Sequence, residues 1–528
     1  MRFLPVNLDA LLVELDDLPQ TLALLASLQA EPIAGIEEVV PAARTLLVRH
    51  RPTALPQAEL ARRLAARPLV AAERAAGPCI EIPVHYDGED LHEVARHCGL
   101  TPAEVVRRHT AAEYTVAFTG FAPGFGYLSG GDPALNVPRR RSPRTRIPAG
   151  AVALAGAFSG VYPQASPGGW QLIGTTGTRM WDLSRAQPAL LQPGQRVRFV
   201  DAGPAGAVAP PLAEVAAPAS PPAGTPQLEV LQAGPQTLWQ DLGRPGLAGQ
   251  GVSASGAMDR ASLRAANRLV GNEPGAAALE AVQGGLALRS HGELVVAVTG
   301  ADGPLTLQAA DGRRWAVPRQ QPLALADGDT LTLGEPRRGM RSYLAVRGGF
   351  VLPAVLGSRA TDTLARLGPA PLVAGDRLAV GAAAGVVGEP TSAPELPAAD
   401  ELVTLDVVMG PRTEWFTAES IARLAEQAWQ VTPQSSRVGL RLQGAQALQR
   451  APGYEAQELP SEGTVRGALQ VPPNGQPVLF MADHPLTGGY PVIGAIAPHH
   501  LDLAGQLPIG ARVRLRPLRP FMPVVPQA

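Results

Sequence analysis

The fold of this chain is read first from the stretch Val116-Ala-Phe-Thr-Gly-Phe-Ala-Pro-Gly-Phe-Gly-Tyr-Leu-Ser-Gly-Gly131. Its apolar start, Val116 to Phe118, predicts a strand. The remainder carries five glycines, one proline and three aromatic residues. Glycine permits backbone angles and close approaches that other residues forbid, and aromatic side chains form flat, rigid walls. A turn rich in both predicts the lip of a pocket rather than a plain connection.

Two further turns continue this pattern. Pro138 to Arg146 is a basic loop, and Ile147 to Ala155 is an apolar segment that predicts a second strand. The third turn is Tyr162-Pro-Gln-Ala-Ser-Pro-Gly-Gly-Trp-Gln-Leu-Ile-Gly174. Turns of this composition that alternate with short strands predict a small closed β-barrel with its loops around one mouth.

Length and charge limit the classes of protein. A chain of 528 residues is too long for a single core, so we expect two to four domains. The formal net charge of −1 argues against nucleic-acid and membrane-surface partners. No apolar run approaches the roughly 18 residues that a spanning helix needs, and acidic residues interrupt Met1 to Leu25. Cys79 and Cys98 are too few for a disulfide framework. We therefore expect a cytoplasmic protein.

The chain contains no lysine, so every basic residue is an arginine. This excludes a Walker-A lysine, a lysine Schiff base and a biotinylated lysine on this chain. Anions must instead be bound by arginine, by backbone N–H groups, by helix N-termini or by a metal.

The predicted fold class is α+β and mostly β. Helices are expected over 17–29, 56–66, 101–110, 260–269 and 417–427, where the capping and periodicity signals are found. Composition shifts divide the chain into a small α+β domain over 1–78, a β-barrel over 79–202, an Ala/Pro-rich linker over 203–227, a β-rich subdomain over 228–381 and a second β-barrel over 402–520.

Two segments of the chain echo each other. Gly168-Gly-Trp-x-x-Ile-Gly174 in the first half matches Gly488-Gly-Tyr-x-x-Ile-Gly494 in the second. The match predicts related β-barrels that meet pseudo-symmetrically. We expect their aromatic, glycine-lined rims to enclose a single chamber fringed by arginine.

Two polar residues stand beside predicted helices. His109 ends the helix that precedes the first pocket turn, so it is a candidate proton carrier, although a lone helical histidine is more often structural. Ser255 precedes the helix over 260–269. It either helps to bind an anion or caps the helix.

The first half resembles the B subunit of bacterial ATP-dependent 5-oxoprolinase, the family also called allophanate hydrolase subunit 1 or kinase-inhibitor I-type. The resemblance rests on Gly120 to Leu128, Pro138-Arg-Arg, Pro143-Arg144, Ile147-Pro-Ala-Gly150 and Ser166-Pro-Gly-Gly-Trp170. One departure is Thr175, where the family usually has arginine after Ile-Gly.

The second half resembles the C subunit, the allophanate hydrolase subunit 2 type. The residues that carry this are Gln240 to Gly246, Ser255 to Asp259, Asn267 to Asn272, Gly357-Ser-Arg359, Thr361-Asp362, Arg437-Val-Gly439, Ser461-Glu-Gly463 and Thr487 to Pro491. Leu486 departs from the threonine often found there. The whole chain resembles a natural fusion of the B and C subunits, and the family's barrels are cyclophilin-like.

The resemblance implies an enzyme that opens 5-oxo-L-proline to L-glutamate with ATP and Mg²⁺, together with the separate A subunit of 5-oxoprolinase. Phosphorylation of the lactam oxygen would make the carbonyl carbon electrophilic, which requires cations around the phosphates and a dry pocket. We expect the phosphates or substrate to contact Arg139, Arg144, Arg146, Ser166, Arg244, Ser255, Arg359, Gly488 and Gly489.

Other residues are assigned to the pocket wall and to the chemistry. Phe125, Tyr127, Trp170 and Tyr490 would form the walls. Asp259, Glu462 and Asp483 are candidates for magnesium or for the lactam N–H, with His109 as the proton carrier. For each arginine the alternative is a solvated loop or a structural ion pair.

Two other functions stay open. The same B-plus-C pair resembles the transferase part of urea carboxylase, which would make the chain a biotin-dependent carboxyltransferase with a carrier on another protein. The kinase-inhibitor name of related proteins suggests a non-enzymatic module that inhibits a histidine kinase. The sequence does not decide whether the chain forms a homo-oligomer.

Overall fold

The structure is a computed structural model that describes residues 1–70, 79–140, 142, 144–203, 226–383 and 385–526. It is mostly β, as expected, with seven α-helices among the described residues. None of those helices is long and apolar enough to cross a membrane. The predicted linker over 203–227 lies almost wholly outside the described residues.

The N-terminal unit is an antiparallel sheet in the order β1-β2-β4-β3 with two helices. Phe3, Leu11 and Val13 face the helices, whereas Leu4 and Leu12 face the C-terminal barrel. Because successive strand residues point to opposite faces, a sheet buried on both sides is apolar throughout. The elements are β1 (Arg2–Asn7), β2 (Ala10–Glu14), α1 (Leu18–Ala30), β3 (Ile36–Pro41), β4 (Thr45–His50) and α2 (Gln57–Ala65).

The first-half barrel is a seven-stranded sheet in the order β12-β9-β10-β7-β6-β13-β5. A bridge between His85 and Thr175 joins the ends of its two outer strands. The elements are β5 (Cys79–Val84), α3 (Leu91–Cys98), α4 (Pro102–Ala111), β6 (Tyr114–Thr119), β7 (Gly126–Ser129), β9 (Ala151–Ala155), β10 (Phe158–Val161), β12 (Gln171–Thr175) and β13 (Arg196–Asp201), with β8 (Arg144–Ile147) paired to β11 (Ser166–Gly168) beside them.

The second half begins with two sheets. The six-stranded sheet has the order β20-β19-β22-β17-β14-β24 and the five-stranded sheet the order β15-β16-β23-β18-β21. The elements are β14 (Gln227–Ala233), β15 (Gln236–Gln240), α5 (Arg260–Leu269), β16 (Ala278–Val282), β17 (Leu286–His291), β18 (Leu294–Asp302), β19 (Leu305–Gln308), β20 (Arg314–Val317), β21 (Pro322–Leu325), β22 (Thr330–Leu333), β23 (Arg338–Val346) and β24 (Arg377–Ala379).

The C-terminal unit is a closed barrel in the order β25-β32-β29-β30-β27-β26-β33. A two-stranded ribbon, β28 with β31, lies outside it. The elements are β25 (Leu402–Met409), α6 (Ala418–Glu426), β26 (Trp429–Val431), β27 (Gly439–Gln443), β28 (Glu462–Gly463), β29 (Ala468–Gln470), β30 (Val478–Phe480), β31 (Thr487–Gly488), β32 (Val492–Ile496), α7 (Leu501–Gly505) and β33 (Arg512–Pro517).

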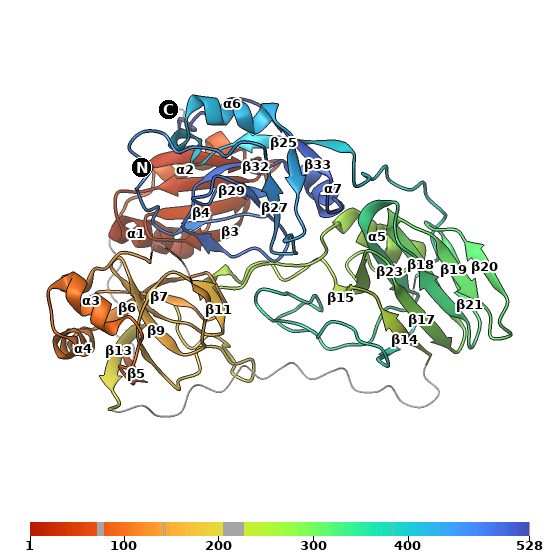
Figure 1. Ribbon diagram of the computed structural model, residues 1–528, viewed down its shortest axis with the longest axis horizontal. Helices are drawn as coiled ribbons and strands as arrows, with labels where there is room; N and C mark the ends of the chain where they lie inside the picture. The colour runs from red at the N-terminus through yellow and green to blue at the C-terminus, as the bar shows by residue number, and fades with distance from the viewer. Residues whose placement is uncertain (71–78, 141, 143, 204–225, 384, 527–528) are drawn as a thin grey trace.

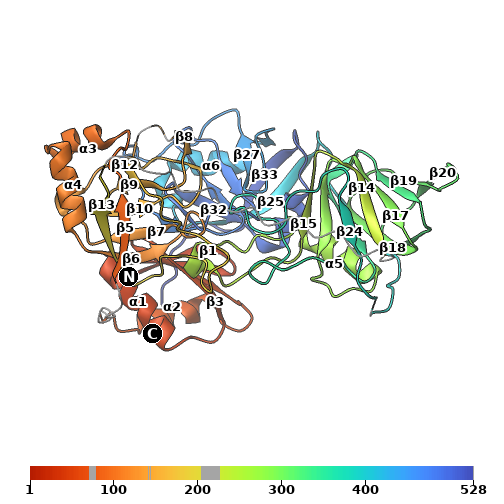
Figure 2. The ribbon, with the colours of Figure 1, turned by 90° about the horizontal axis from the view of Figure 1, so that it is seen from below.

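The first and last parts of the chain pack together. Leu4, Leu12 and Leu47 of the N-terminal sheet share one apolar cluster with Phe480 and Val492 of the C-terminal barrel. Figure 1 shows this pair at the upper left, with the first-half barrel below it and the two-sheet unit at the right, and Figure 2 shows the first-half barrel and the two-sheet unit at opposite ends of the view. The packing brings loops from both barrels to a common boundary.

Candidate functional site

A cavity of about 490 Å³ lies at the boundary between the first-half barrel and the C-terminal barrel. We call it the interbarrel chamber. The two echoing turns, Gly168 to Trp170 and Gly488 to Tyr490, both line it. The first half also contributes Phe121, Phe125, Tyr127, Arg139, Arg140 and Tyr162, and the second half Arg450, Glu455, Glu458, Ser461 and Thr487.

The aromatic residues of the first half form a packed wall. The Phe125 ring lies edge-to-face against Tyr127, Tyr162 and Trp170, with centroid separations of 5.1, 5.3 and 5.2 Å. This arrangement is favourable for aromatic quadrupoles. Phe125 and Tyr127 are buried, so the wall is rigid and apolar and suits one face of a small flat ring.

Glycine leaves room for side chains of the other half where the two halves approach each other. A Cβ added to Gly489 would lie 2.1 Å from Arg139 Nη1, and one added to Gly120 would lie 2.6 Å from Thr487 Oγ1. Both distances are far shorter than a real carbon contact. The two positions therefore allow loops of the two halves to come within hydrogen-bonding reach.

Hydrogen bonds cross the chamber from one half to the other. Arg139 Nη2 donates to Ser461 Oγ at 2.9 Å, and the hydroxyls of Tyr127 and Thr487 lie 3.4 Å apart. Arg139 has no ion-pair partner among the described residues. Its charge is therefore available to an anionic group in the chamber.

Arg450 is a second chamber arginine, and the sequence did not single it out. Its guanidinium lies 5.5 Å from the centroid of the Trp415 ring. Burial lowers its pKa, and Tyr490 opposes that shift. Within the described ranges it also lacks an ion-pair partner. No family motif marks this residue, so only its position in the fold reveals it.

The other arginines expected in the first half lie elsewhere. Arg144 donates to both carboxylate oxygens of Asp90, at 2.8 and 2.9 Å, and to Glu89. Arg146 is exposed on β8. Arg144 thus follows the structural alternative, because a carboxylate from a distant part of the sequence neutralises it. Ser166 is on β11, and its buried Oγ has no partner among the described residues.

His109 is a core residue. It is fully buried on α4, where it bonds to Tyr86 OH at 2.7 Å and to Ser159 Oγ at 2.9 Å. Its ring stacks on Phe199. Burial lowers its pKa to about 3, so the imidazole is neutral at physiological pH. These contacts correct the interpretation of His109 as a proton carrier.

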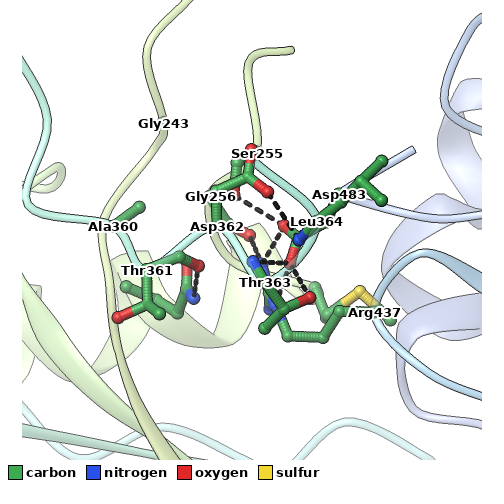
Figure 3. A network of polar contacts seen from close by, with 12 residues as sticks. Gly243, Ser255, Gly256, Ala360, Thr361, Asp362, Thr363, Leu364, Arg437 and Asp483 are labelled. Carbon is green, nitrogen blue, oxygen red and sulfur yellow. Dashed lines mark hydrogen bonds and ion pairs between the residues drawn. The ribbon is translucent and has the colours of Figure 1, made fainter. Parts of the chain in front are cut away.

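Asp483 and Ser255 meet in a buried polar group that joins the two-sheet unit to the C-terminal barrel, shown in Figure 3. Asp483 accepts hydrogen bonds from Ser255 Oγ at 2.6 Å, Thr363 Oγ1 at 2.7 Å and Arg437 Nη2 at 2.9 Å. Arg437 also pairs with Glu280 at 2.6 Å. We call Ser255, Asp362, Thr363, Arg437 and Asp483 the Asp483 junction. Ser255, Thr363 and Arg437 all donate to Asp483, whereas the Asp362 carboxylate accepts from Ser253 Oγ and from the backbone N–H groups of Leu364 and Ala365.

Asp362 is the titratable member of this junction. It is 1% exposed, and burial, followed by the nearby Asp483 charge, raises its pKa to about 7.

Arg244 lies close to Asp362 and donates to Ala360 O, while its Nε and Nη1 have no partner among the described residues. Burial lowers the pKa of Arg244. Arg359 donates through its backbone N–H to Asp241 and through Nε to Leu352 O.

Asp259 has a structural role. It is the N-cap of α5, where its carboxylate accepts from Ser262 N at 2.9 Å, from Ser262 Oγ and from Gln506. Ser255 therefore does not cap that helix. Ser255 instead donates to Asp483, and it adopts a positive φ of 53°.

Glu462 points away from the chamber. It pairs with Arg412, which also binds Glu14 of the N-terminal sheet at 2.8 Å. Its neighbour Ser461 lines the chamber instead, because successive residues of an extended segment face opposite sides. Of the Ser461-Glu-Gly463 motif, the serine is therefore the residue that lines the chamber.

The three acids expected to bind magnesium do not fit that ion. Asp259 is occupied by capping hydrogen bonds, Glu462 by Arg412, and Asp483 by Arg437 and two hydroxyls. Magnesium prefers carboxylates that are free to bind it in a nearly octahedral shell.

The two departures from the family pattern also lie off the chamber: Thr175 bonds to Asp87, and Leu486 is buried.

Two family patterns match the chain. The carboxyltransferase domain, subdomain C and D, matches residues 1–191, and the carboxyltransferase domain, subdomain A and B, matches residues 250–517. The chain is 38% identical over 286 residues to the 5-oxoprolinase C subunit of Escherichia coli K12, covering 54% of this chain and 88% of that protein. It is 52% identical over 124 residues to the 5-oxoprolinase B subunit of Escherichia coli O157:H7, covering 23% of this chain and 57% of that protein.

Larger proteins share part of this chain, and one solved structure shares nearly all of it. The urea amidolyase of Saccharomyces cerevisiae is 32% identical over 309 residues, which covers 55% of this chain and 16% of that protein. The crystal structure of TTHA0988 superposes with a TM-score of 0.82 at 36% identity and covers 96% of this chain and 99% of that one. The combined arrangement of both halves in one chain therefore has a solved counterpart.

Proposed function

The chain belongs to the carboxyltransferase-domain family, as a fusion of segments homologous to the B and C subunits of 5-oxoprolinase, and from this premise we propose that it is the B–C component of an ATP-dependent 5-oxoprolinase. In this proposal it converts 5-oxo-L-proline to L-glutamate together with a separate A subunit. The interbarrel chamber is where the cyclic amide binds.

The observation that carries the proposal is the pairing of an aromatic wall with an uncompensated arginine in one chamber. 5-Oxoproline has a flat lactam ring and one carboxylate. The ring matches the wall formed by Phe125, Tyr127 and Trp170, and the carboxylate matches Arg139, because guanidinium and carboxylate pair through two hydrogen bonds. Arg450 supplies a second positive charge at the chamber.

The chemistry needs activation of a resonance-stabilised amide. Transfer of the γ-phosphoryl group of ATP to the lactam oxygen gives ADP and an electrophilic carbon. Water adds to that carbon, the C–N bond opens to an acyl phosphate, and a second water releases phosphate and leaves glutamate. The chain's contribution would be to orient the ring, hold its carboxylate and limit access of water. Asp259, Glu462 and Asp483 already accept hydrogen bonds or ion pairs from the chain itself.

The test is a reconstitution with purified proteins. The chain is mixed with its A subunit, ATP and 5-oxo-L-proline, and the release of ADP and glutamate is measured. We expect both products in equal amounts from the mixture, and much less from either protein alone. If the mixture consumes ATP without 5-oxoproline dependence, or forms no glutamate, the proposal is wrong.

A carboxyltransferase is the second candidate, and the similarity to urea amidolyase and the family description favour it. Because the chain has no lysine, biotin would have to be carried by another protein. The same chamber would then bind the carboxyl acceptor. Transfer of carboxyl from carboxybiotin to an amide, in a mixture that forms no glutamate, would select this function over the first.

A further inference from the structure

A second cavity, of about 290 Å³, lies where the N-terminal sheet, the start of α5 and the C-terminal barrel meet. Four arginines line it: Arg49, Arg260, Arg264 and Arg466. We call it the arginine cavity. Its lining shares no residue with that of the interbarrel chamber.

The two arginines of α5 have no carboxylate partner. Arg260 Nε is buried and unpartnered among the described residues, and its Nη2 reaches only Ser255 O at 3.5 Å. Among the residues that the structure describes, the Arg264 side chain has no hydrogen bond or ion pair. Arg264 is exposed, whereas Arg260 is partly buried, and an unpaired guanidinium at a partly buried site is costly unless something else neutralises it.

The other two arginines are only partly compensated. Arg466 Nη2 donates to Met258 O at 2.6 Å and lies 3.8 Å from Asp502, but its buried Nε has no partner among the described residues. Arg49 lies 3.6 and 3.7 Å from Glu37 and Glu38, beyond a normal hydrogen bond. Donors on both therefore remain available.

Three acids also line the cavity, one fewer than the arginines. Asp502 accepts the backbone N–H groups of Arg260 and Ala261, at 3.0 and 3.1 Å, and Glu38 accepts that of Gly246 at 3.1 Å. Asp9 is the third acid. The excess positive charge is consistent with the pKa of Arg260, which burial and then Arg466 lower to about 10.

We propose that the arginine cavity binds a phosphate group. Guanidinium groups reach the cavity from three separate elements: β4, α5 and the loop before β29. One arginine can satisfy a planar carboxylate, so several converging arginines suit a multiply charged oxyanion better. Because the chain has no lysine, arginine is its only side chain with a permanent positive charge to offer a phosphate. The group could belong to free phosphate or to a nucleotide.

The cavity is adjacent to the interbarrel chamber through one short segment. His484 and Leu486 line the arginine cavity, whereas Pro485 and Thr487 line the chamber. A phosphate bound in the arginine cavity would therefore lie on the opposite side of this segment from the interbarrel chamber. This inference does not rest on the proposed reaction, because the binding is a property of the chain alone.

The test is isothermal titration of the full chain with inorganic phosphate, ADP and adenosine at constant ionic strength, since salt screens exposed charges. We expect phosphate or ADP to bind and adenosine not to. Arg264→Gln should weaken the binding by about tenfold, the value of one charge-assisted hydrogen bond. Arg268→Gln is the matched control, because Arg268 is exposed on the same helix one turn beyond the cavity.

The outcomes separate the sources and can overturn the inference. Equal affinity for phosphate and ADP indicates free phosphate, and much tighter ADP binding that Arg264→Gln weakens indicates the phosphate of a nucleotide. Arg260→Gln is a second variant, expected to weaken binding without lowering the thermal midpoint. If neither phosphate nor ADP binds, or if both variants bind like the wild type, the inference is wrong.

Discussion

Arg139 in the first half of the chain donates a hydrogen bond of 2.9 Å to Ser461 Oγ in the second half. The two residues are 322 positions apart in the sequence and line the same chamber. No single half contains both the aromatic wall and the glycine turn that faces it. The chamber is therefore a property of the fused chain, or of two separate proteins held together.

Arg139→Gln tests the role of the uncompensated chamber arginine. The substitution removes the charge but keeps a hydrogen-bond donor for Ser461. Loss of a charge-assisted hydrogen bond of about 1.5–3 kcal/mol should lower kcat/KM for 5-oxoproline by roughly 10- to 100-fold. Arg146→Gln is the control, because Arg146 is exposed on β8. Equal losses in the two variants would contradict the assignment.

Glu462→Gln tests the structural role of Glu462. The carboxylate is buried against Arg412, and breaking a buried ion pair costs about 3 kcal/mol, at the low end of its range because Glu14 still pairs with Arg412. Urea denaturation should show this loss, whereas turnover per folded molecule stays at the wild-type value. Full stability with lost turnover would instead make Glu462 part of the chemistry.

Asp362 predicts a pH dependence of stability. Its pKa is about 7 in the folded chain and near 3.9 when unfolded, so the folded state binds the extra proton and stability falls as pH rises. The expected loss between pH 5 and 7 is on the order of 2 kcal/mol. In Asp362→Asn, which mimics the protonated group, urea denaturation should show a flatter pH profile. An unchanged profile would exclude Asp362 as its source.

His109→Phe distinguishes a core histidine from a proton carrier. The substitution leaves the hydroxyls of Tyr86 and Ser159 without their shared partner, which costs about 1–3 kcal/mol for each buried group. The free energy of unfolding should fall by about 1–3 kcal/mol for each hydroxyl that is left without its partner. Turnover, corrected for the folded fraction, should stay within about twofold of wild type, whereas loss of a general acid–base costs 10²-fold or more.

Local features of the fold were predictable from the sequence. Thr101 caps α4 by accepting from Glu104 N, and α5 spans Arg260–Leu269, because capping and periodicity act over a few residues. The echo between the two Gly-Gly-aromatic turns correctly placed both at one chamber. These turns can be recognised in the sequence because they combine glycine with aromatic residues.

Side-chain partners from distant segments were not predictable. Arg144 looks like Arg139 in the sequence, yet only Arg144 meets Asp90, which lies 54 residues earlier in the chain. Ser461 and Glu462 are neighbours, and which of them faces the chamber depends on how the extended segment packs against the N-terminal sheet. These outcomes depend on tertiary contacts rather than on local pattern.

The most direct measurement is 5-oxoproline-dependent ADP release by Gly489→Ala in the presence of the A subunit. The added Cβ would lie 2.1 Å from Arg139 Nη1 and must displace that flexible guanidinium, while Gly489 does not have a left-handed φ that alanine would strain. Gly249→Ala is the control, since its Cβ meets open space. We expect a roughly 10- to 100-fold loss for Gly489→Ala at an unchanged thermal midpoint and none for the control. Wild-type turnover in Gly489→Ala would contradict binding of the substrate in the interbarrel chamber.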